Sequence, residues 1–165
     1  MTINEFQNKI FLDKNHLSQS FSIEYLENSI IEYLYKYHRI KIERARYEGR
    51  FYPELLILDR TRNIFGYISI QHHTAENNIL AEKIEFDLST KKRIQVSYSE
   101  LDRPVFFIHC FSGKSSIEIY FLTSEQIQDI ILRNIEEGNQ TPFFPNKDVM
   151  GSFVEFINIV KTNIK

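Results

Sequence analysis

The sequence is poor in cysteine and contains no long apolar run. Cys110 is the only cysteine among 165 residues, so no disulfide forms within the chain, and no Cys/His cluster has zinc spacing. The lack of a long apolar stretch argues against a membrane-spanning helix. The opening segment MTINEFQNKIFLDKNH has neither a basic region nor a small-residue cleavage site. We therefore expect a soluble, cytoplasmic protein without a secretory signal.

The chain also has no strong overall charge, although its basic residues are unevenly distributed. The formal net charge is -2, whereas residues 36–62 hold eight Lys or Arg and four Asp or Glu. Such a stretch is usually a solvated surface, and it is also what a phosphate-binding surface needs. The length, with 42% hydrophobic and 25% charged residues, predicts a single domain over residues 1–165.

Residues 23–37 carry apolar side chains at helical spacing, with Ser22 as the expected N-cap. At about 100° per residue, Glu27 falls within roughly 50° of the centre of the apolar stripe. Glu27 is therefore a candidate buried or cleft-lining acid.

Several segments have the alternation or the apolar character of strands. The turn DRTRN joins two of them and predicts an antiparallel hairpin, and the continuously apolar PVFFIHCF is typical of a strand covered on both faces. Residues 74–103 are a polar excursion with two weak strand patterns. The predicted strands are RIKIERARY, FYPELLILD, FGYISIQHH, PVFFIHCF and IEIYF, in that order.

Two helices are predicted after these strands. Thr123 and Gln126 form a capping-box pattern that opens a helix ending near Gly138. The prolines of QTPFFPN separate it from an apolar-faced C-terminal helix over residues 147–164. The whole pattern predicts an α/β fold with a mixed central sheet flanked by helices.

The end of FGYISIQHH gathers polar side chains. The two-residue period of a strand places Gln71 and His73 side by side on one face and His72 on the apolar face. Antiparallel pairing brings Glu54 toward Gln71 if the turn centres near residues 61–63. An acid, an amide oxygen and an imidazole then converge. The alternative is that Gln71 and His73 only satisfy backbone groups or face water.

Two other motifs are assigned no chemistry. SGKSS resembles the tail of a phosphate-binding loop, but Ile108 replaces the earlier glycine and a strand follows, so Lys114 is expected to be an exposed turn residue. Cys110 and His109 are strand neighbours that point to opposite faces, which predicts a buried structural thiol rather than a nucleophile pair.

This order of elements resembles the PD-(D/E)XK nuclease superfamily, the restriction-endonuclease-like fold, particularly its Mrr-like branches with Q-x-K as the second motif. The resemblance covers residues 22–137. In this sequence His73 replaces the lysine and Gln71 replaces the second acid. The matching positions are Pro53-Glu54 for the first motif, Gln71-His72-His73 for Q-x-K and Glu27 for the helix acid.

The resemblance implies a metal-dependent endonuclease, either divergent or inactive. Glu54 and Gln71 would hold Mg or Mn with Glu27 nearby, while His73 would assist the attacking water or the phosphate. One carboxylate and one amide supply few of the oxygen ligands that magnesium needs, and imidazole favours manganese or zinc. Weak metal binding is therefore expected. The residues expected to contact a nucleic-acid backbone are Arg44, Arg46, Arg60 and Arg62.

The alternative from another class is a non-catalytic interaction module that uses the sheet surface or the C-terminal helix to bind a protein partner or a second copy. Fourteen Phe and nine Tyr supply aromatic contact surface. Binding that falls steeply with salt would indicate nucleic acid instead.

Overall fold

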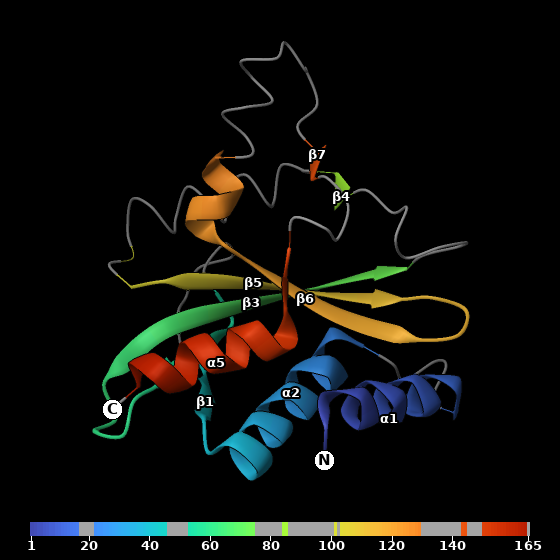
Figure 1. Ribbon diagram of the computed structural model, residues 1–165, viewed down its shortest axis with the longest axis horizontal. Coiled ribbons are helices and arrows are strands. Elements are labelled where there is room, and N and C mark those ends of the chain that lie inside the picture. The colour runs from blue at the N-terminus through green and yellow to red at the C-terminus, as the bar shows by residue number, and fades with distance from the viewer. Residues whose placement is uncertain are drawn as a thin grey trace.

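A six-stranded mixed sheet forms the centre of the computed structural model, which describes residues 1–16, 22–45, 53–74, 84–85, 101, 103–129, 143–144 and 150–164. Three helices lie against one face of the sheet (Figure 1). The predicted α/β class with a mixed sheet and flanking helices is confirmed. The helices are α1 Ile3–His16, α2 Ile23–His38 and α5 Phe153–Asn163. The strands are β1 Lys41–Arg44, β2 Leu55–Leu58, β3 Ile64–Thr74, β5 Val105–Ser112, β6 Ile117–Thr123 and β8 Gly151–Ser152.

The strand order in the sheet is β1-β2-β3-β5-β6-β8. Four of the five pairings are antiparallel, and β3 pairs with β5 in parallel. β3 and β5 therefore end on the same side of the molecule, next to the β5–β6 turn at the right of Figure 1. A separate antiparallel ladder joins β4 (Ile84–Glu85) to β7 (Phe143–Phe144), and the other positions of the predicted 74–103 strands lie mostly outside the described residues.

The predicted hairpin between β2 and β3 is confirmed, and its turn has a clear chemical cause. The Asp59 carboxylate accepts hydrogen bonds from the backbone N–H groups of Thr61 and Asn63, each at 2.9 Å. Arg62 takes a left-handed conformation with φ 67°. An aspartate that binds its own turn in this way fixes the register of the two strands. Leu55 then lies opposite Ile68.

The helix starts follow local capping signals. Ser22 caps α2 as predicted, accepting from the Tyr25 N–H at 3.2 Å. The predicted capping box at Thr123 is also formed, with the Thr123 N–H donating to Gln126 Oε1 at 2.9 Å, and residues 124–129 are helical. The remainder of that predicted helix lies outside the described residues. None of the helices in the described ranges has the length and apolar character that a membrane crossing requires.

The C-terminal helix differs from the predicted 147–164 range. It begins at Phe153, because Gly151 and Ser152 pair with β6 as a short strand and Ser152 then caps the helix. Glycine is required in this strand, since a Cβ on Gly151 would stand 2.2 Å from a ring carbon of the buried Phe121. Residues 147–149 lie outside the described residues.

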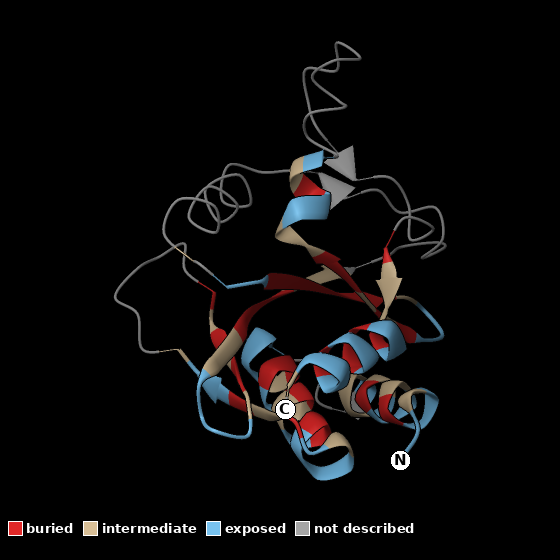
Figure 2. Cartoon of the chain, turned by 60° about the vertical axis from the view of Figure 1, so that its left-hand side comes forward, coloured by how far each residue is buried: buried red, intermediate tan, exposed pale blue. Residues whose placement is uncertain are grey.

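The sheet has apolar side chains on both faces. On one face, the helices turn their buried sides inward and their exposed sides outward (Figure 2). Every residue of β5 is buried, as the continuously apolar sequence predicted. On the other face lies a smaller apolar group, which we call the second-face cluster. It consists of Tyr67, Val105, Phe107, Phe111, Leu122, Ile127 and Met150.

Candidate site at the end of β3

The predicted site residues stand at the end of the sheet where β3 finishes. β2 begins at Leu55, opposite Ile68, so residues 69–74 of β3 extend beyond the start of β2. Gln71 and His73 lie on this extension, which pairs with β5 on its other side. Glu54 directly precedes β2, and its carbonyl oxygen accepts from the Ala45 N–H at 2.8 Å. All three residues therefore belong to one end of the sheet.

The register places Glu54 near, but not opposite, Gln71. Extending the observed pairing by one residue would set Glu54 beside Ser69. Ser69 and Gln71 are neighbours on one face because they are two residues apart on a strand. The acid and the amide are thus diagonal to each other, and the predicted direct pairing is offset by two residues.

Glu27 is buried, as its place on the helical stripe predicted, with 6% of its surface exposed. Its carboxylate forms an ion pair with Arg44 of β1, with 3.1 Å between Oε2 and Nη1, and Arg44 also donates to the Asn28 amide oxygen at 2.7 Å. Burial raises the pKa of Glu27, Arg44 opposes that rise, and the charge of Glu54 adds to it. Glu27 and Glu54 therefore lie within electrostatic reach at this end of the sheet.

His73 is paired with a second imidazole that the sequence did not identify as its partner. Because β3 and β5 are parallel and Gln71 lies beside His109 in the register, His73 reaches His109 diagonally. The distance from His73 Nε2 to His109 Nδ1 is 3.0 Å, so one nitrogen donates and the other accepts. The His73 ring also stacks on Phe111, with 5.0 Å between ring centroids. This pair lies on the face of the second-face cluster.

Burial keeps both imidazoles uncharged. It lowers the pKa of His73 to about 4 and that of His109 to about 3; His72 adds to the lowering at His73, and His73 adds to that at His109. His73 therefore carries no positive charge at neutral pH, unlike the lysine in the motif that it resembles. Its Nε2 atom is engaged by His109 and is not directed at a phosphate.

The opposite face of the same strands has a different polar pair. His72 Nε2 lies 2.6 Å from the hydroxyl oxygen of Ser112, which is buried. Cys110 is fully buried on this face, and burial raises the pKa of its thiol to about 12. The expectation of a buried structural thiol is confirmed, since a thiol with this pKa is a poor nucleophile at neutral pH.

The side chains at the end of β3 do not fit a magnesium ion well. Magnesium prefers an octahedral shell of hard oxygen ligands, usually including one or two carboxylates. Gln71 offers an amide, His73 is held by His109, and Glu27 is held by Arg44. Within the described ranges, no group of three or more His, Cys, Asp or Glu is arranged to hold a metal ion.

The predicted cationic residues do not share one surface. Arg44 is half-exposed but bound to Glu27, and Arg46 lies outside the described residues. Arg60 and Arg62 are exposed in the β2–β3 turn, at the other end of β3 from His73. At about 3.3 Å per residue the two ends are about 30 Å apart.

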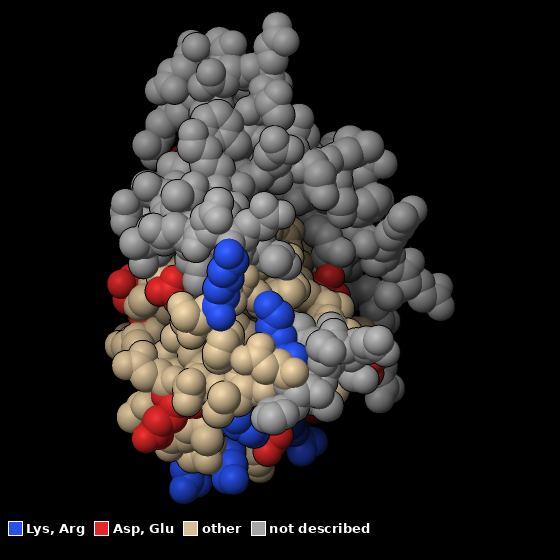
Figure 3. All heavy atoms as spheres, turned by 90° about the vertical axis from the view of Figure 1, so that its right-hand side faces the viewer, with Lys and Arg blue, Asp and Glu red and all other residues tan. Residues whose placement is uncertain are grey.

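Lys114 lies at the same end of the sheet as His73. It is exposed in the β5–β6 turn, just beyond the register pair Thr74 and Ser112. Seen from this side, basic side chains occupy the middle and lower edge of the described surface, and most acidic ones lie toward its margins (Figure 3). The predicted exposure of Lys114 is confirmed, and the fold places it beside the candidate site.

Sequence reasoning proposed Glu27, Glu54, Gln71 and His73 as site residues and missed His109 as the partner of His73. The only available signal was the two-residue period of PVFFIHCF, which sets His109 and Cys110 on opposite faces. The parallel register that brings His109 to His73 joins segments far apart in the sequence and leaves no local pattern. No protein-family model matches this chain, and no curated protein matches it significantly.

Proposed function

We propose that this chain is a nucleic-acid-associated protein of restriction-endonuclease-like architecture that binds nucleic acid without metal-dependent cleavage. The main support is the position of the two acids that the resemblance names: Glu27 binds Arg44 at 3.1 Å, and Arg44 lies opposite Leu55, the residue after Glu54. Both acids lie at the end of an antiparallel β1-β2-β3 unit, where β3 also brings Gln71 and His73.

The loss of cleavage follows from the chemistry of the side chains. A metal-dependent phosphodiesterase needs a cation to polarise the phosphate and activate water. Gln71 supplies no negative charge, and Glu27 is neutralised by Arg44. The uncharged His73 replaces neither the lysine nor its positive charge. We infer that these groups belong to a nucleic-acid-binding surface that no longer holds a metal ion.

The surface that meets the nucleic acid is proposed to include the exposed part of Arg44, which lies level with Ile68 in the sheet, and Lys114, which lies beyond the end of β3. Arg60 and Arg62 are about 30 Å away along β3. A duplex rises about 3.4 Å per base pair, so only a ligand of about nine base pairs or more contacts both ends. Binding that strengthens sharply beyond this length would show that both ends take part.

The apolar face of α5 does not offer the protein-binding surface of the alternative hypothesis. Phe153, Phe156, Ile157 and Val160 are buried in the protein's own core. Val154 and Ile159 remain exposed on the outer side, and single exposed apolar residues are common on protein surfaces. This observation favours nucleic acid over a partner bound through the buried side of the helix.

Fluorescence anisotropy with labelled duplex DNA, single-stranded DNA and RNA tests the proposal. We expect binding that weakens steeply with salt, and intact plasmid after incubation with Mg²⁺ or Mn²⁺. Salt-independent binding, or no binding to any of the three, would contradict the association with nucleic acid. Plasmid cleavage by the unmodified protein that disappears in the Glu54→Ala variant would contradict the proposed loss of catalysis.

Substitution of Glu54 separates a metal-free surface from a metal site. Without a metal, the carboxylate repels phosphate, so Glu54→Gln should leave nucleic-acid affinity unchanged or increase it by a few-fold. With a bound metal, the same change would weaken binding, and the loss would depend on added Mn²⁺. The matched control is Glu43→Gln, which removes an exposed acid from β1.

A further inference from the structure

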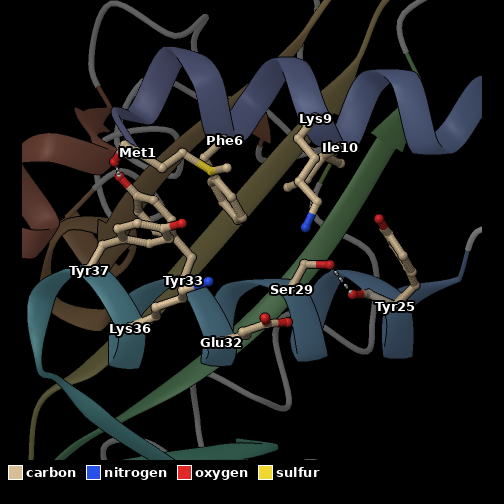
Figure 4. Close-up of a pocket in the computed structure, with 10 residues that line it drawn as sticks. All are labelled: Met1, Phe6, Lys9, Ile10, Tyr25, Ser29, Glu32, Tyr33, Lys36 and Tyr37. Carbon is tan, nitrogen blue, oxygen red and sulfur yellow. Dashed lines mark hydrogen bonds between the residues drawn. The ribbon is translucent and has the colours of Figure 1, made fainter.

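A pocket of about 150 Å³ lies between α1 and α2, away from the candidate site. Figure 4 shows its side chains reaching from both helices into the space between them. Besides Tyr25, the lining holds three aromatic residues and three charged ones. They are Phe6 and Lys9 from α1, and Glu32, Tyr33, Lys36 and Tyr37 from α2.

The aromatic residues pack on one another, and only the outer ring is accessible. The Phe6 and Tyr33 rings are stacked, with centroids 4.2 Å apart, and Tyr37 lies 5.4 Å from Tyr33. The Tyr33 hydroxyl donates to the Met1 carbonyl oxygen at 3.1 Å, which holds the middle ring in place. Tyr37 remains 38% exposed, so the outer ring is accessible. Phe6 and Tyr33 are only 3% and 2% exposed, so Tyr37, supported by them, is the ring on which a planar ligand would stack.

The charged residues define which planar ring fits. Lys9, Glu32 and Lys36 line the pocket and form no ion pair with any other residue in the described ranges, and Lys9 reaches from α1 toward α2 (Figure 4). A phenyl ring would strip water from these groups without offering hydrogen bonds in return. A nitrogenous heterocycle carries both donors and acceptors on its edge, and these match a carboxylate beside an ammonium group.

A second, shallower hollow continues from the pocket. It has a volume of about 540 Å³ and is lined by Glu32, Tyr35, Lys36 and Arg39, so the two spaces share Glu32 and Lys36. Tyr35 is 65% exposed there. Over both spaces three cations face one acid, which leaves an excess of positive charge for an anionic group. The pocket alone is smaller than the roughly 300 Å³ of typical ligand sites and holds about one ring.

We propose that these two spaces together bind a nucleotide. The base stacks on the accessible ring of Tyr37, the base edge meets Lys9 and Glu32, and the phosphate extends into the hollow to Lys36 and Arg39. The source is either a free mononucleotide or an unpaired nucleotide of a nucleic acid. This site uses no residue from the end of β3, so it can be tested independently of the proposed function.

Isothermal titration of the full chain with AMP, GMP, CMP and UMP tests this site, with any tag at the C-terminus because Met1 lines the pocket. We expect at least one nucleotide to bind with a dissociation constant of about 1 mM or lower. Ribose 5-phosphate, inorganic phosphate and phenylalanine should each bind more weakly, since none offers both the heterocycle and the phosphate. Equal binding of any of the three, or no nucleotide binding up to about 10 mM, would overturn the proposal.

Three variants locate the binding. Lys36→Ala and Tyr37→Leu should each weaken nucleotide binding by about tenfold, through lost charge and lost stacking. Lys161→Ala is the matched control, because this exposed lysine in the last turn of α5 lines neither space and should leave nucleotide affinity unchanged. Thermal melting checks that the variants are folded. Nucleotide binding that survives both pocket changes would place the ligand elsewhere and refute the site.

Competition distinguishes the two sources. If a short single-stranded oligonucleotide displaces the mononucleotide and is itself weakened by Lys36→Ala, the pocket takes an unpaired nucleotide of a nucleic acid. If the oligonucleotide does not compete, the ligand is a free nucleotide. Binding at the end of β3 would instead respond to Lys114→Ala, so failure of one site does not imply failure of the other.

Discussion

At the residue scale, the imidazole pair of His73 and His109 decides what the candidate site can do. The two rings share a hydrogen bond of 3.0 Å and stack with Phe111. Because burial lowers both pKa values, the pair is neutral at the pH at which a lysine would be charged. The pair therefore contributes to the sheet's packing and gives no electrostatic attraction to phosphate.

This pair should make the protein sensitive to acid. The folded pKa values of about 4 and about 3 lie below the unfolded value near 6.5. Below pH 6.5 the unfolded chain binds protons that the folded chain does not, so stability falls as the pH drops toward 4. We expect the free energy of unfolding to fall by on the order of 1–2 kcal/mol per pH unit over this range, measured by urea titration.

The double variant His73→Gln/His109→Asn tests whether the imidazole pair causes this loss of stability at acidic pH. Gln and Asn place amide groups near Nε2 and Nδ1, so the hydrogen bond is retained without a titrating ring. The variant should lose much of the slope between pH 6.5 and 4. A residual slope is expected from His38 and His72, whose pKa values burial also lowers. An unchanged slope would show that the pair is not the source.

The sequence could predict only part of this site. The alternation in FGYISIQHH placed Gln71 and His73 on one face, because that pattern is local. The partner of His73 depended on the parallel register between β3 and β5, which no local pattern encodes. The position of Glu54 was predicted to within two residues of register, since it depended on the details of one turn.

At the element scale, α2 is tied to β1 by the ion pair of Glu27 and Arg44. The Glu27 side chain is 7% exposed and that of Arg44 is 46% exposed. Such a pair adds little net stability by itself, but loss of one partner leaves a buried charge uncompensated. The pair holds the helix acid in position beside Glu54.

Arg44→Ala should therefore be clearly destabilising. We expect a loss of about 1–3 kcal/mol in the free energy of unfolding, measured by urea denaturation. Adding Glu27→Gln to Arg44→Ala should recover part of it, because the unpaired charge is removed. Lys41→Ala is the matched control on the same strand, since its 3.4 Å contact with Glu43 is exposed and should contribute less than about 1 kcal/mol. Equal losses at Arg44 and Lys41 would refute this account.

The elements themselves were predicted unevenly, for physical reasons. α2 combined an apolar stripe with a serine cap, and both signals were visible in the sequence. α1 was not predicted, although Thr2 and Glu5 form a capping box with hydrogen bonds of 2.8 and 3.1 Å. Its apolar side chains, including Phe6 and Ile10, are few, and the helix is held largely by packing. The start of α5 was misplaced because pairing with β6 takes the preceding residues into the sheet.

At the scale of the whole molecule, the sheet separates two differently packed sides. The face covered by α1, α2 and α5 holds the larger core. The opposite face carries the imidazole pair and the second-face cluster. β3 and β5 finish beside Lys114 at one end of the sheet, and Glu54 and Gln71 lie on the side of β2 and β3 toward that end. The central claim is that this end binds nucleic acid.

Amide hydrogen exchange with and without a duplex of about 16 base pairs, at low salt, tests that claim most directly. The account predicts slower exchange at residues 69–74 of β3 and in the β5–β6 turn around Lys114, reversed when the salt concentration is raised. Bound duplex that leaves these segments unchanged and slows exchange only on the outer side of α5 would contradict it.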